Sequence, residues 1–193
     1  MLHQIASAKR PASLDAPRGS ASGGILYSLT WAMLPWKKES ARLHPAVYTL
    51  GVAYHGGTFL SFFWLVVLFF RLGLPRIVAS GSAGLLGLTA LAGLVLLVRR
   101  ALNPNLRYFS SPDDYFSNIL VTGFQVLTAV TLARVAATGP LFVYAGLLLA
   151  YIPVGKLRHA LYFGLARYYL GLFYGRRGVW PVGNGRAWRS QRP

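Results

Sequence analysis

The sequence predicts an all-α integral membrane protein: a four-transmembrane-helix bundle with an N-terminal interfacial helix and a C-terminal helical extension. Three observations predict this class. Hydrophobic residues make up 54% of the 193 residues and charged residues only 12%, about half the charged fraction of an average soluble domain. Several uncharged runs are long enough to cross a bilayer, which takes about 20 apolar residues in a helix. The basic residues are also distributed very unevenly among the segments between these runs.

The two ends of the chain differ in composition from the middle. Residues 1–24 are polar, basic and rich in Ser, Ala, Pro and Gly, and we expect a flexible cytoplasmic tail. The segment 25–43 contains the apolar stretch ILYSLTWAMLPW, which is too short to span and predicts an interfacial helix anchored by tryptophans. Residues 176–193 predict a second cytoplasmic tail.

A membrane domain is expected at 44–175, with spans at about 44–70, 77–98, 115–137 and 141–158. The first span begins with Pro45, which suits the first turn of a helix because its missing N–H is not needed there. The second span is rich in small residues. Its pairs Ser80/Gly84 and Ala83/Gly87 predict close packing against a neighbouring helix.

The third span has a well-marked start. We expect Ser111 to be the N-cap, Pro112 the first helical residue, and Asp113 and Asp114 the first-turn acids that suit the helix dipole. Capping is favoured over a proton relay for these carboxylates, because the Ser-Pro-Asp-Asp sequence accounts for them. The fourth helix is expected to continue through the basic and aromatic segment from residue 156 and to leave the bilayer there.

The positions of the lysines and arginines predict the topology. Six lie before the first span, three lie between the second and third spans, and eight lie in the C-terminal region, whereas only three lie on the other side. This bias puts both termini in the cytoplasm. Most of the net charge of +16 lies on this predicted cytoplasmic side, where we expect the basic side chains to contact membrane lipid. No nucleic-acid-binding motif is present, and we expect no nucleic-acid partner.

Two histidines on different spans predict a bis-histidine haem site. His55 lies well inside the first span, where an ionisable side chain indicates a functional site. His159 lies near the inner end of the fourth span, which returns to the same side. Haem iron takes axial nitrogens from opposite faces, and the macrocycle fits between the helices of a bundle. Gly51, one turn earlier on the same face, and Gly56 and Gly57 beside it would leave room for a porphyrin next to His55.

Each histidine also has a simpler interpretation. His55 alone could be a hydrogen-bonded packing residue, and His159, with basic neighbours, could be an interfacial cation. His44 lies three turns before His55 on the same helical face. It is a possible alternative ligand, although its position at the start of the span is the simpler explanation. The chain has no cysteine, which excludes cysteine-ligated clusters and covalently attached haem.

Three basic residues near the predicted inner face have two possible anionic partners. Lys156, Arg158 and Arg107 could contact the propionates of a haem or the phosphates of lipid headgroups.

Several stretches resemble the cytochrome b (gamma) subunit family of respiratory nitrate reductases. They are HPAVYTLGVAYHGGTFLSF, SPDDYFSNILV, IPVGKLRHALYF and FGLARYYLGLFYGRRGVWP. The resemblance is strongest to the shorter relatives that accompany heterodisulfide-reductase-like iron–sulfur proteins in anaerobic and sulfur-metabolising prokaryotes. That family holds two haems with two histidine pairs, and His55 and His159 match the pair nearer the cytoplasmic partner. The second pair has no counterpart, because the chain reads Phe63-Trp64-Leu65 at one position and has no histidine at the start of the fourth span. The resemblance therefore implies one haem b.

The resemblance also implies a role in the cytoplasmic membrane of a prokaryote. The chain would pass electrons between the quinone pool and a cytoplasmic iron–sulfur subunit of a nitrate-reductase-like or heterodisulfide-reductase-like complex. It would be an electron-transfer subunit rather than a complete enzyme, because no flavin, dinucleotide or substrate site is visible. The alternative is a haem-free membrane anchor for such a complex. A small transporter is a weaker alternative, because the sequence has neither an internal repeat nor paired broken helices.

Overall fold

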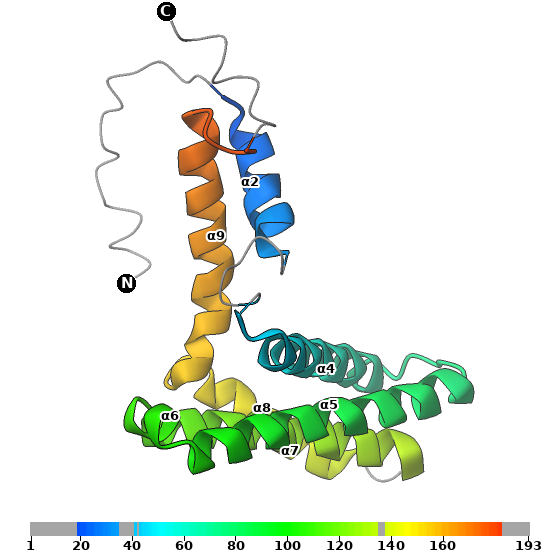
Figure 1. Cartoon of the computed structure of the whole chain (residues 1–193). Helices are drawn as coiled ribbons and strands as arrows, with labels where there is room; N and C mark the ends of the chain where they lie inside the picture. Colours follow the sequence, from blue (N-terminus) through cyan, green and yellow to red (C-terminus); the bar gives the residue numbers. More distant parts are fainter. Residues whose placement is uncertain (1–18, 35–40, 42, 135–137, 183–193) are drawn as a thin grey trace, which may run out of the picture. The chain divides into compact units, whose positions relative to one another are not determined.

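The computed structural model of the chain describes residues 19–34, 41, 43–134 and 138–182 (Figure 1). Within these ranges every regular element is a helix. The chain forms two compact units, one of Met1–Lys37 with Phe163–Pro193 and the other of Lys38–Tyr162. Most of the two predicted tails, at 1–18 and 183–193, lies outside the described residues, as does much of the predicted interfacial segment, at 35–40 and 42.

The larger unit is built from four helices: α4 (Pro45–Phe69), α5 (Arg76–Leu102), α7 (Pro112–Arg134) and α8 (Gly139–Tyr151). Two short helices lie beside them, α6 (Pro104–Tyr108) and the 3-10 helix η3 (Lys156–Arg158). Helices α4, α5 and α7 are each long and apolar enough to cross a membrane, and α8 with the helix after it counts as a fourth if the two form one broken span. The prediction of an all-α membrane protein is therefore confirmed, with three to four candidate spans.

The fourth span is not the continuous helix that the sequence predicts. Helix α8 ends at Tyr151, a turn follows, and η3 leads into α9 (His159–Arg176). Pro153 lies in this break, where it has no N–H to donate to a preceding carbonyl. The N–H groups of Val154 and Gly155 both bond back to the carbonyl of Tyr151, at 3.0 and 2.9 Å. Because of this break, His159 is the first residue of α9 and not an interior residue of an extended α8.

Helix α7 is the central element of this unit, because it contacts α4, α5 and α8. One apolar cluster includes Phe124, Leu141 and Leu148, which are fully or almost fully buried. A second cluster includes Trp64 and Leu86. Together they bury one stripe of each long helix, and the remaining apolar side chains face outward, as expected for helices surrounded by lipid.

A buried amide joins the three longest helices. Gln125 on α7 is completely buried, and its Nε2 donates to the carbonyl of Tyr54 and to the hydroxyl of Thr58, both at 2.9 Å. Its Oε1 accepts the hydroxyl hydrogen of Thr89 on α5 at 2.8 Å. Gly57 on α4 makes this approach possible, since a Cβ there would collide with Thr89 and with Gln125.

The small residues of α5 do not all pack as the sequence suggests. Ala83 is buried, but Gly84 and Gly87 face outward, and a Cβ at either would have no described atom within 4 Å. The close approach occurs at Gly93 instead, where a Cβ would collide with the ring of Tyr54. The prediction of tight packing at Gly84 and Gly87 is therefore wrong, because helical rotation points them away from the partner helices.

The smaller unit contains α2 (Ala21–Leu29), the 3-10 helix η1 (Trp31–Met33) and α9 from Phe163 onward. Helix α2 begins within the predicted tail, because the Ser20 side chain accepts the Gly23 N–H at 3.1 Å and caps it. Gly24 faces Gly171 and Gly175 of α9, and a Cβ at any of the three would collide with the opposite backbone. This is the small-residue packing that lets two helices approach closely.

The close approach at Gly57 predicts a specific loss of stability. Replacing Gly57 by Ala should destabilise the protein by about 1–3 kcal/mol, the usual cost of overpacking a well-filled core. Gly84→Ala is the matched control, because it adds the same methyl group to an outward face and should be neutral or slightly stabilising. Thermal unfolding in detergent would measure both variants, and equal melting temperatures would contradict the packing described here.

Candidate functional site

His55 and His159 lie together in the larger unit. His55 is on α4, and His159 is the first residue of α9, directly after η3. Their ring centroids are 6.4 Å apart and the ring planes are inclined by 74°. Both side chains are exposed, which does not support the interpretation of His55 as a buried packing residue. Two histidines separated by about a hundred residues in the sequence therefore meet at one surface.

The Nδ1 atom of each ring is bonded to a backbone carbonyl. His55 Nδ1 lies 2.7 Å from the oxygen of Gly51, one turn earlier on α4, and His159 Nδ1 lies 2.6 Å from the oxygen of Lys156. Because a carbonyl oxygen can only accept, Nδ1 carries the hydrogen in both rings. In the neutral imidazole the lone pair is then on Nε2. Metal-binding histidines are commonly held in this way, with the other ring nitrogen donating to a carbonyl.

The donor set suits haem better than a bare metal ion. Among the described residues, no group of three or more His, Cys, Asp or Glu side chains could hold a metal ion. Haem iron needs only axial ligands from the protein, because the porphyrin supplies the others. Metal–imidazole bonds are about 2 Å long, so two axial rings on one iron have centroids roughly 6–6.5 Å apart. The observed centroid separation of 6.4 Å lies in this range.

Two of the three glycines near His55 leave space on its side of α4. A Cβ added at Gly51 or Gly56 would have no described atom within 4 Å, whereas Gly57 faces the core. Gly51 also supplies the carbonyl that holds the His55 ring. The expected open space is therefore present at Gly51 and Gly56, whereas the same prediction for Gly57 is wrong, because that residue packs against Thr89 and Gln125.

The other predicted site residues are placed differently. His44 is the N-cap of α4, about 16 Å along the helix axis from His55, and no described ring contact joins it to His159. Arg158 is exposed in η3, next to His159 in sequence, and Arg107 is exposed on α6. The Lys156 ammonium lies 2.5 Å from a carboxylate oxygen of Asp114, so its described partner differs from the predicted propionate or lipid phosphate.

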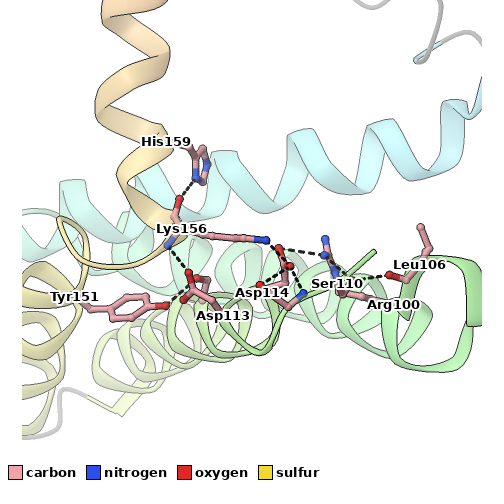
Figure 2. A network of polar contacts seen from close by, with 10 residues as sticks. Arg100, Leu106, Ser110, Asp113, Asp114, Tyr151, Lys156 and His159 are labelled. Atoms are coloured by element: carbon pink, nitrogen blue, oxygen red, sulfur yellow. Dashed lines mark hydrogen bonds and ion pairs between the residues drawn. The ribbon is translucent and has the colours of Figure 1, made fainter. Parts of the chain in front are cut away.

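The carboxylates at the start of α7 do more than cap the helix (Figure 2). Asp114 accepts the backbone N–H of Ser111 at 2.8 Å, as the predicted first-turn acid should. It also pairs with Arg100 of α5 at 3.3 Å and with Lys156 of η3. The sequence did contain a signal for these pairs, since acidic residues are so few that partly buried carboxylates near a membrane require basic partners. It could not indicate which basic residues those are.

A cavity of the larger unit lies away from the histidine pair. It has a volume of about 930 Å³ and lies between the second half of α4 and α8, with walls that include Leu65, Val66, Phe142 and Leu149. Its described walls contain no histidine.

Comparison of the chain with models of protein families, with curated proteins and with solved structures gives no match. The resemblance to the nitrate reductase gamma subunits thus rests on the sequence motifs alone.

The proximity of the two histidines can be tested without any cofactor. The chain has no cysteine of its own, so the double variant His55→Cys/His159→Cys carries the only two thiols. A short bifunctional thiol reagent should link these two positions within one chain in membranes. The control is His44→Cys/His159→Cys, in which one thiol is about three helical turns away from the site. The extent of cross-linking is measured by mobility on a denaturing gel after a single engineered protease cut between the two positions. Equal cross-linking in the two variants would contradict the described geometry.

Proposed function

We propose that the chain is the membrane cytochrome b subunit of a respiratory oxidoreductase complex. It passes electrons between the quinone pool and a cytoplasmic iron–sulfur partner through one bis-histidine haem b. The observation that carries the proposal is the pairing of His55 and His159 at 6.4 Å, with each Nδ1 held by a carbonyl and each Nε2 left as the ligand atom.

The residues around the pair have distinct roles in this proposal. His55 and His159 hold the iron through Nε2, and the carbonyls of Gly51 and Lys156 fix the rotation of the two rings. Gly51 and Gly56 leave the surface of α4 open for the macrocycle. Arg158, exposed beside His159, is a cation that can meet a propionate. When bound, the haem supplies a one-electron carrier of the kind that connects a two-electron quinol to an iron–sulfur cluster.

Two further features support a single haem and a docked partner. The described walls of the cavity between α4 and α8 contain no histidine, and the sequence lacks the second histidine pair. The predicted cytoplasmic side carries 17 of the 20 lysines and arginines. Such a surface favours a partner with an acidic docking face, because complementary charge accelerates and orients association.

A haem-free membrane anchor remains the second candidate, and one observation favours it. Both histidines are exposed and bonded to carbonyls three or four residues earlier in their own segments. A surface histidine without a ligand can make the same local bond. The two functions therefore differ in a single measurable property, the presence of haem.

An optical difference spectrum tests the proposal. The chain, produced in membranes with a supply of haem, should show the alpha band of a b-type cytochrome in the dithionite-reduced minus oxidised spectrum. His55→Ala and His159→Ala should each abolish it, because one remaining imidazole cannot form the six-coordinate low-spin iron. His44→Ala is the matched control and should retain the full band.

The opposite results would each be informative. A correctly inserted chain without any band would overturn the cytochrome proposal and favour the anchor. A band that survives His159→Ala but is lost in His44→Ala would move the site to another histidine pair.

A further inference from the structure

The segment that carries His159 is held in place by two adjacent carboxylates. Asp113 Oδ2 accepts the backbone N–H of Lys156 at 2.8 Å, and Asp114 Oδ2 lies 2.5 Å from the Lys156 ammonium. The carbonyl of Lys156 accepts the Nδ1–H of His159 at 2.6 Å. Figure 2 shows these contacts in series, from the start of α7 through Lys156 to the imidazole. All four residues belong to the same compact unit.

Helix capping explains only part of this arrangement. Asp114 accepts both the N–H and the hydroxyl of Ser111, at 2.8 and 3.1 Å, as a capping acid does. The described hydrogen bond of Asp113 goes instead to η3, to a residue 43 positions later. The N-cap of η3 is Gly155, which makes no side-chain cap. Asp113 therefore supplies from another helix the acceptor that η3 lacks.

The contacts have the features of a rigid connection. The Asp114 side chain is only 14% exposed, and it joins Lys156 to Arg100 on α5 as well as to its own helix. Hydrogen bonds between charged groups are shorter and about twice as strong as neutral ones. The bond to the Lys156 backbone N–H restricts the position of η3, and the bond to its ammonium, on a side chain that is 48% exposed, adds a weaker restraint.

The two histidines need such support to different degrees. The carbonyl that holds His55 belongs to Gly51, inside the 25-residue helix α4. The carbonyl that holds His159 belongs to a three-residue 3-10 helix, which has little stability by itself. The Lys156 carbonyl that holds the His159 ring therefore depends on contacts from outside η3.

We propose that Asp113, Asp114 and Lys156 form a clasp that positions the His159 imidazole as an axial ligand. The inference rests on the proposed cytochrome function. The clasp residues are positioning residues, because they act on the iron only through the Lys156 carbonyl. Acceptors of this kind fix the tautomer and the orientation of a metal-binding histidine and raise its basicity. The clasp thereby sets the angle between the two imidazole planes and contributes to the reduction potential.

A cross-linking experiment tests the positioning without haem. The double variant His55→Cys/His159→Cys is combined in turn with Asp113→Ala, Asp113→Asn and Asn103→Ala. Asp113→Ala removes the acceptor for the Lys156 N–H and should slow cross-linking roughly tenfold. Asp113→Asn keeps an oxygen at that place and should restore most of the rate. Asn103→Ala is the matched control, since Asn103 caps α6 through the N–H groups of Asn105 and Leu106 and has no described contact with His159.

A spectroscopic experiment on the haem-loaded, histidine-intact chain tests the axial role. Asp113→Ala should keep the b-type band but lose haem roughly tenfold more readily, as expected when an outer partner of a ligand is removed. The anisotropy of the low-spin ferric EPR signal should change, because it depends on the angle between the axial rings. The midpoint potential should rise, because a less basic imidazole stabilises ferric iron less. Asp113→Asn should have the EPR signal of the unaltered protein. Asn103→Ala should match the unaltered protein in haem retention, EPR signal and midpoint potential.

The two experiments separate the failure of the clasp from the failure of the cytochrome proposal. One result would overturn the clasp alone. In that result, Asp113→Ala has a normal b-type band, and its cross-linking rate, EPR anisotropy and midpoint potential are all unchanged. A chain without any haem band would overturn the cytochrome proposal and the axial role with it, whatever the cross-linking rates. If Asn103→Ala changes these properties as much as Asp113→Ala does, the clasp proposal is wrong, because the change is then a general effect of lost helix capping.

Discussion

The structure of the larger unit depends on the buried amide of Gln125. This one side chain bonds to α4 through the Tyr54 carbonyl and the Thr58 hydroxyl, and to α5 through Thr89. In a bilayer there is no hydrophobic force between helices, so close packing and interhelical hydrogen bonds decide how they associate. An amide with both of its ends satisfied can be buried at little cost, whereas an unsatisfied one cannot. The position of Gln125 therefore determines which faces of α4 and α5 turn inward.

The contacts of Gln125 set the rotation of α4 about its axis, and this rotation places His55 on the exposed face of the helix. Tyr54 and Gly57 face the core, and the Tyr54 hydroxyl donates to the carbonyl of Asn118 on α7 at 3.0 Å. Successive residues of a helix are rotated by about 100°, so His55 turns outward together with Gly51 and Gly56. The packing of one face thus exposes a histidine between two glycines on another. A rotation of α4 by one residue would bury the imidazole and remove the pairing with His159.

Polar groups are divided between two places with different chemistry. The network around Gln125, inside the helix bundle, is made of neutral groups. The network around Asp114 lies at the start of α7 and contains the charged groups Arg100 and Lys156. This division agrees with the high cost of charge inside a bilayer and its lower cost near the ends of the helices. The charged network is also where the second histidine is attached.

The sequence by itself determined the helical membrane class, the approximate limits of the first three spans, the acidic start of α7 and the presence of an ionisable histidine within the first span. These features are local, because they depend on the length of apolar runs, on capping residues and on residue types that are costly in a bilayer. Only the tertiary structure decided the break after Tyr151, the outward direction of Gly84 and Gly87, the partners of Gln125 and the link from Asp113 to Lys156. These features depend on the rotation of each helix about its axis and on contacts between residues far apart in the chain. The hydrophobic pattern of a membrane helix encodes that rotation only weakly, because apolar side chains suit both lipid and protein neighbours.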